Sequence, residues 1–183
     1  MKILIFAGSL RRDSLNKKFA REAMRLLSAR AGVETEFVDL QPLAIPVYDG
    51  DVEEASGVPA GVKELAGKIL AADALVISTP EYNGSIPGIL KNVIDWLSRL
   101  KPVSVSGKPL LLLAATPGAY GGMRSLWHTR QPFEALGTHV FPEMLGLPLA
   151  HQAFDESGGL KDAKLVERLE GLLERFLAHA RRR

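Results

Sequence analysis

The chain opens with KILIFAGSLRRDSLN (residues 2–16), in which a continuous apolar run gives way at Gly8 to a polar loop. The apolar run, residues 3–7, is typical of a parallel strand covered on both faces. It is far too short for a signal-peptide core or a membrane span. A helix should follow the loop, because apolar residues fall on one stripe before Gly32 ends the pattern. This opening predicts a buried strand, a loop and a helix in a cytoplasmic protein.

The same alternation of strands and helices continues along the chain. Further strands are predicted at 33–40, 74–79, 110–115 and 139–141. Further helices are predicted from Pro59, from Pro87, from about Met123 with a disturbance at Pro132, and over 165–177. The buried stripe of the helix from Pro59 should contain Val62, Leu65, Ala66, Ile69 and Leu70. The segment 41–57, rich in Pro, Gly and acidic residues, is predicted to be a long surface connection.

Strand and helix alternate about five times, which predicts an α/β fold with right-handed crossovers. The expected architecture is a five-stranded parallel sheet with helices on both faces, in the flavodoxin-like order 2-1-3-4-5. In that order the carboxyl ends of the first and third strands lie side by side, where ligands bind. The length of 183 residues fits a single domain spanning residues 1–183.

The composition excludes several kinds of chemistry. There is no cysteine, so thiolate catalysis, disulfides, cysteine-held iron–sulfur clusters and cysteine zinc sites are ruled out. Any redox chemistry must therefore come from a bound cofactor. The four histidines show no paired metal-ligand spacing, so no metal site is expected. The net charge is only +2 and lies partly in Arg181, Arg182 and Arg183, a tail typical of a solvated helix end and not of nucleic-acid binding.

The loop after the first strand, residues 8–16, has the chemistry of an anion site. Unpaired amides and the positive end of the helix dipole converge at a helix N-terminus. Arg11 can add a charge-assisted bond to a phosphate, although Ser14 or Asp13 would equally serve as an ordinary helix cap. The loop has neither a Walker A motif nor the Gly-x-Gly-x-x-Gly of a dinucleotide-binding turn. It therefore fits a compact ligand with one phosphate.

Two more loops with ligand-binding chemistry follow the third and fourth strands. In TPEYNGSIPG (79–88), Tyr82 offers an aromatic body, Asn83 offers donors and acceptors, and Gly84 lets the backbone approach a ligand. Pro, Asn and Gly are also ordinary turn residues. TPGAYGG (116–122) contains three glycines and an aromatic residue. Since all three loops would open at one edge of the sheet, they predict a shared crevice.

These motifs resemble a known family. GSLRRDSLN (8–16) closely matches the phosphate loop of the NADPH-dependent FMN reductases. PEYNGSIPG (80–88), continuing through LKN (90–92) and IDW (94–96), looks like that family's second hallmark. The likeness runs in order along nearly the whole chain, to the stretch 154–160 before the last helix. The most similar branch includes enzymes described as quinone, azo-dye and chromate reductases.

The resemblance implies FMN as the cofactor, NADPH or NADH as the co-substrate, and a small molecule as the electron acceptor. Residues implied to surround the FMN phosphate are Ser9, Arg11, Ser14, Leu15 and Asn16. Those implied to meet the ribityl chain and ring edge are Pro80, Glu81, Tyr82, Asn83 and Gly84, and those on the pyrimidine side are Thr116, Gly118, Gly121 and Gly122. No catalytic side chain is implied, because hydride transfer needs no protein base. A homodimer or homotetramer is implied as well, with no membrane or nucleic-acid partner.

Some residues and functions remain outside this scheme. The segment 125–128 matches no strict pattern and receives no role, and Trp96 and Trp127 are predicted to be core or interface residues. One alternative function is a flavodoxin-type electron carrier without NAD(P)H activity, but such carriers are typically acidic and this chain is mildly basic. A phosphoacceptor signalling domain would need acidic residues after the first strand and an Asp after the third. The chain has Gly8-Ser9 and Thr79-Pro80 there.

Overall fold

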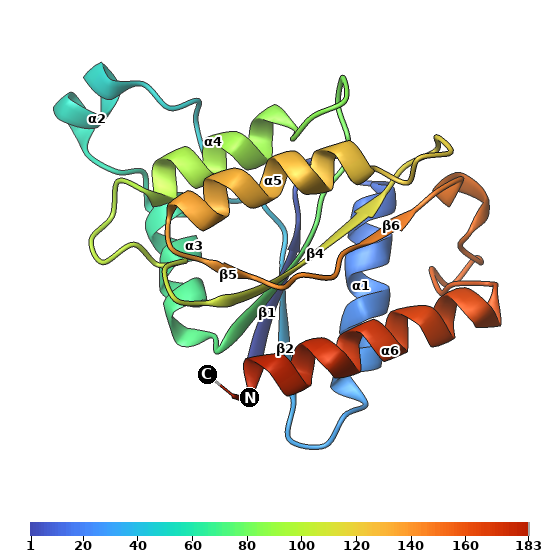
Figure 1. Cartoon of the computed structure of the whole chain (residues 1–183). Helices are drawn as coiled ribbons and strands as arrows, with labels where there is room; N and C mark the ends of the chain where they lie inside the picture. Colours follow the sequence, from blue (N-terminus) through green and yellow to red (C-terminus); the bar gives the residue numbers. More distant parts are fainter. Residues whose placement is uncertain (183) are drawn as a thin grey trace.

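The computed structural model describes residues 1–182; Arg183, the last residue of the predicted basic tail, lies outside the described residues. The strands are β1 (Lys2–Ala7), β2 (Glu34–Val38), β3 (Ala74–Ser78), β4 (Pro109–Ala115), β5 (His139–Val140) and β6 (Leu145–Leu147). The helices are α1 (Leu15–Ser28), α2 (Gly50–Ser56), α3 (Ala60–Ala71), α4 (Gly88–Leu97), α5 (Met123–Ala135) and α6 (Ala163–Ala180), with a short 3₁₀ helix, η1 (Ala150–Gln152). Strands alternate with helices through the chain, which confirms the predicted α/β fold (Figure 1).

All strand pairs are parallel, and the order β2-β1-β3-β4-β5 confirms the flavodoxin-like topology. Ile5 of β1 lies between Phe37 of β2 and Val76 of β3, so β1 and β3 are direct neighbours and end at the same edge. The loops after β1, β3 and β4 therefore meet at one edge of the sheet, as the sequence predicted.

The last sheet position differs from the prediction, because β5 and β6 both pair with β4 and the sheet has six strands. β5 pairs with Pro109 and Leu110, and β6 pairs with the far end of β4. Between them lies Pro142, which has no N–H to donate to a ladder and interrupts the pairing. At three residues with a central glycine, β6 is too short to give a periodic signal.

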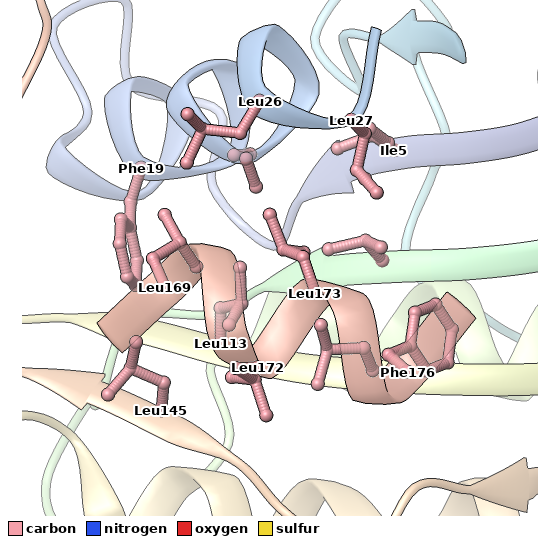
Figure 2. Close-up of a cluster of buried hydrophobic side chains, with 14 of the residues drawn as sticks. Ile5, Phe19, Leu26, Leu27, Leu113, Leu145, Leu169, Leu172, Leu173 and Phe176 are labelled. Carbon is pink, nitrogen blue, oxygen red and sulfur yellow. The ribbon is translucent and has the colours of Figure 1, made fainter. Parts of the chain in front are cut away.

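The sheet is covered on both faces. Alternate residues of β1 point to opposite sides: Ile3 and Ile5 belong to the cluster with α1 and α6, and Leu4 and Phe6 to the cluster with α3, α4 and α5. Figure 1 shows the same division of the helices. Figure 2 shows side chains of α1 and α6 packed together over the sheet, among them Phe19, Leu26, Leu27, Leu169, Leu173 and Phe176. This double cover explains why every residue of β4 is buried.

Some local details differ from the predictions. The connection 41–57 contains the short helix α2, which Asp49 caps by accepting a hydrogen bond from the Asp51 N–H. Leu70 is 49% exposed, because at 3.6 residues per turn it falls beside the stripe of Val62 and Ile69 and not on it. The helix from Met123 runs to Ala135, so Pro132, where a disturbance was predicted, does not end it.

The two tryptophans have different surroundings. Trp96 is fully buried, and its indole N–H donates to the Pro46 carbonyl. Trp127 is 57% exposed, so it is not a core residue. Within residues 1–182, no helix combines the length and the apolar character that a membrane crossing requires.

Candidate functional site

The loop after β1 forms the capped helix start that the sequence predicted. Ser14 is the cap of α1: its Oγ accepts hydrogen bonds from the N–H groups of Asn16 (3.2 Å) and Lys17 (3.4 Å). Leu15, the first helical residue, has an N–H without an intrahelical partner. Ser9 is buried, and Arg11 is exposed. The arrangement offers an amide, a hydroxyl and a guanidinium group to an anion.

Asn16 has a second role that the sequence did not reveal. Its side chain is 2% exposed, donates to the Ala115 carbonyl (2.8 Å), and accepts from the Ala115 N–H and the Ser78 hydroxyl (both 2.8 Å). These bonds tie the start of α1 to the ends of β3 and β4. The phosphate contact implied for Asn16 remains a prediction.

The loop after β3 contains a tight two-residue hairpin turn. Tyr82 and Ser85 exchange backbone hydrogen bonds of 3.1 and 3.0 Å. Between them, Asn83 and Gly84 have φ angles of 51° and 74°. Positive φ at both central positions defines a type I′ turn, for which Asn-Gly is the favoured pair. The turn therefore accounts for the choice of Asn83 and Gly84 without reference to a ligand.

Backbone packing accounts for two glycines of the loop after β4. Gly121 and Gly122 both have positive φ, of 61° and 82°. A Cβ on Gly121 would lie 2.9 Å from the backbone of Gly146 in β6, and one on Gly122 would lie 2.7 Å from the Ala114 Cβ in β4. Gly118 has no neighbour within 4 Å of such an atom. The cofactor contacts implied for these glycines remain predictions.

The three loops enclose a cavity of about 420 Å³ at the carboxyl edge of the sheet. Its lining includes these predicted site residues: Ser9, Arg11, Ser14, Leu15, Asn16, Pro80, Glu81, Tyr82 and Thr116. Five predicted residues are not among those that line it: Asn83, Gly84, Gly118, Gly121 and Gly122. Lining residues that the sequence analysis missed are Asp13, Ala115, Pro117 and His151. His151 comes from η1, and nothing in its sequence neighbourhood marks it as part of this edge.

A second hollow of about 750 Å³ adjoins this cavity at the start of α1 and shares Arg11, Asp13 and Ser14 with it. Its cationic lining residues are Arg11, Arg12, Lys17, Lys18 and Arg21, against the acidic Asp13 and Asp39. Burial raises the pKa of Asp39, but hydrogen bonds from the Lys17 ammonium and the Gln41 N–H outweigh it, and the pKa lies below its usual range. The excess of cations makes this end of the site attractive to phosphate groups.

The residues present fit a flavin mononucleotide better than a metal. Within residues 1–182, no group of three or more His, Asp or Glu side chains could hold a metal ion. The cavity falls in the size range of small-ligand sites. Its lining includes the capped start of α1 and Tyr82. Glu81 is engaged by Arg124 and by the Ser125 N–H, which fits the expectation that it is not a general base.

Fold and site together define a flavodoxin-like domain whose switch-point crevice suits a planar ligand with one phosphate. The chain belongs to the NADPH-dependent FMN reductase family, whose model matches residues 1–152. This family uses FMN with NAD(P)H as the electron donor, and the protein is accordingly an oxidoreductase.

Individual relatives agree with this assignment over nearly the whole chain. The quinone reductase of Escherichia coli K12 is 38% identical over 179 residues, which are 96% of this chain and 93% of the relative. The NAD(P)H-dependent FMN reductase of Pseudomonas aeruginosa is 39% identical over 184 residues, 100% of this chain and 96% of the relative. The solved structure of a flavoenzyme NAD(P)H:(acceptor) oxidoreductase from Paracoccus denitrificans has a TM-score of 0.83 at 28% identity, with 99% and 97% of the two chains covered.

Proposed function

We propose that this protein binds one FMN per subunit in the 420 Å³ cavity and uses it to pass electrons from NAD(P)H to a quinone. The observation that carries the proposal is the meeting of three loops in one cavity, with a capped helix start at its phosphate end. Family membership and the quinone reductase relatives support the choice of cofactor and acceptor.

Each part of the cavity has a task in this proposal. When bound, FMN supplies hydride acceptance from the nicotinamide and electron delivery to the acceptor. Arg11, Ser14 and the first N–H groups of α1 hold the phosphate. Pro80 and Tyr82 form the wall for the ring, and backbone N–H groups of the loop 116–122 offset negative charge at the pyrimidine edge. No side chain is required to move a proton for the hydride step.

The test begins with cofactor titration. FMN should bind at one per subunit and much more tightly than FAD, because the first loop lacks a dinucleotide turn. Equal or better affinity for FAD would contradict the proposal. The loaded protein should then oxidise NADPH or NADH in the presence of a quinone and without any partner protein. Reduction only through a partner protein would instead identify an electron carrier.

The finer assignments are parts of the same proposal. Azo compounds, chromate and free flavin are further candidate acceptors, to be compared with quinones in one steady-state panel.

We also propose that residues 1–183 form one domain and that the protein assembles as a homodimer or homotetramer. The exposed aromatic side chains of Tyr120 (79% exposed) and Trp127 (57%) support association. A fully active monomer at micromolar concentration in sedimentation would refute the oligomer.

A further inference from the structure

Side chains of the first two turns of α5 contact the loop after β3. Neither the sequence motifs nor the family match gives these contacts a role. We propose that Arg124, Ser125 and His128 form a positioning clamp for this cofactor-binding loop, and that Arg124 offsets the negative charge of Glu81 at the cavity wall. The inference rests on the proposed FMN site. It gives a role to the segment 125–128, which the sequence alone left without one.

The central contact of the clamp is the ion pair between Glu81 and Arg124. The Glu81 carboxylate accepts from Arg124 Nε at 2.8 Å, from Arg124 Nη2, and from the Ser125 N–H at 3.4 Å. The Glu81 side chain is only 9% exposed and lines the cavity, whereas Arg124 is 63% exposed. The Glu81 carboxylate is therefore largely shielded from solvent, whereas its arginine partner is not.

Two further contacts hold the loop on both sides of its hairpin. The Ser125 hydroxyl, fully buried, donates to the Pro80 carbonyl at 2.8 Å, just before the turn. His128 Nδ1 lies 2.9 Å from the Ser85 hydroxyl, just after it. Since the type I′ turn makes residues 82–85 stiff, fixing its two flanks fixes the whole loop.

Arg124 also connects two of the cofactor loops. A Cβ on Gly84 would lie 3.5 Å from Arg124 Nη1, so the guanidinium runs past the tip of the hairpin. Its central carbon lies 5.9 Å from the ring centre of Tyr120, which belongs to the loop after β4. One side chain thus contacts the loops that follow β3 and β4.

The charge of Glu81 gives the clamp a consequence beyond shape. A flavin gains negative charge when it is reduced, and an uncompensated carboxylate at the cavity wall would oppose that gain. The guanidinium group of Arg124 offsets the negative charge of Glu81. Loss of Arg124 should therefore weaken FMN binding and also lower the midpoint potential of the bound flavin.

Four variants test the clamp. Arg124→Gln should bind FMN about tenfold more weakly, the effect of losing one charge-assisted contact, and should lower the midpoint potential. Arg124→Lys keeps the charge and should retain the potential while losing part of the affinity. Adding Glu81→Gln to Arg124→Gln should return the potential toward the wild-type value. Arg99→Gln is the matched control, because Arg99 makes a similar pair with Glu53 away from the cavity and should change neither quantity.

Urea unfolding of the apoproteins shows whether a variant is destabilised as a whole. Because Arg124 is exposed, its substitution should change the free energy of unfolding little. If Arg124→Gln had the same FMN affinity and the same midpoint potential as Arg99→Gln, the proposed clamp would be refuted. It would also be refuted by a potential that falls in Arg124→Gln but does not recover when Glu81 is neutralised. If Arg124→Gln fails to fold, the Arg124→Lys and Glu81→Gln single variants decide, the latter with an expected rise in potential. Failure of the wild-type protein to bind FMN would refute the proposed function itself.

Discussion

The loops after β1 and β3 line the same cavity but are built in opposite ways. In the first loop the cation Arg11 is exposed and has no ion pair among the described residues, while the backbone is tied down by Ser14 and Asn16. In the second loop the charge of Glu81 is buried and paired, and the backbone follows a hairpin turn. The first loop keeps its charge available for a ligand. The second uses its polar groups to keep its own shape.

The largest expected effect concerns the Asn16 hydrogen bonds that anchor the first loop to the sheet. Asn16→Ala removes three buried hydrogen bonds and leaves the Ser78 hydroxyl and both backbone groups of Ala115 without their partner. Unpaired buried polar groups are costly, so we expect a loss of about 3 kcal/mol in the free energy of unfolding. Urea denaturation of the apoprotein measures this directly.

Asn83→Gly is the control, because Asn83 is an asparagine of the second loop with a positive φ that glycine also adopts. Its free energy of unfolding should change by about 0.5 kcal/mol or less. Equal effects of the two substitutions would mean that the first loop is not anchored by Asn16 as the structure indicates.

The next effect concerns the free charge of the first loop. Arg11→Ala should weaken FMN binding by roughly 1.5–3 kcal/mol, a ten- to hundredfold change, by removing a charge-assisted contact with the phosphate. Arg12 is also exposed but does not line the 420 Å³ cavity, so Arg12→Ala should change the affinity little. Fluorescence titration of the apoproteins gives both values.

Riboflavin, which has no phosphate, separates the phosphate contact from other causes. It should bind weakly to the wild-type protein and to both variants and barely distinguish them. A damaging Arg12→Ala with a silent Arg11→Ala would place the phosphate contact one residue further along the loop. If both were silent, backbone amides and hydroxyls would have to hold the phosphate.

A smaller effect concerns the hairpin of the second loop. Gly84→Ala places a side chain at a φ of 74°, which should cost about 1–2 kcal/mol in the free energy of unfolding. The control is Gly67→Ala within α3, where the added Cβ meets nothing within 4 Å and should stabilise by about 0.5–1 kcal/mol. A Gly84→Ala variant as stable as the wild type would show that the turn has no strict demand for glycine.

Much of the fold could be predicted because it depends on patterns along the chain. The continuous apolar runs of β1, β3 and β4 and the striped helices between them fix a parallel sheet with two covered faces. β6 could not be predicted, because it has only three residues, lies in a segment that contains prolines, and is a strand only through its pairing with β4. Leu70 was misplaced because it lies at the margin of its stripe.

The candidate site was predictable to a different extent in the first and second of its three loops. The first loop has a local signal, a capped helix start with Arg11 beside it, and all five of its predicted residues line the cavity. In the second loop the turn accounts for Asn83 and Gly84, which do not line the cavity, and the cofactor contacts implied for them remain predictions. The partners of that loop, Arg124, Ser125 and His128, lie some 40 residues further along the chain, a separation that no local pattern reveals.

The smallest expected effect concerns the ion pair that anchors α1, at the end of the first loop, to the chain after β2. Lys17 Nζ lies 2.8 Å from Asp39, whose pKa lies below its usual range because the bonds from Lys17 and Gln41 outweigh the effect of burial. A lowered folded-state pKa stabilises the protein above the unfolded pKa, which is about 4, and the contribution disappears as the pH falls through the lowered value. With a third of the Asp39 side chain exposed, we expect only about 0.5 kcal/mol. The difference in the free energy of unfolding between wild type and Asp39→Asn, measured in urea from pH 7 downward, should be constant to about pH 4 and shrink below it. A difference that grew as the pH fell would show that the Asp39 carboxylate destabilises the fold, and the first loop would then owe its position to Ser14 and Asn16 alone.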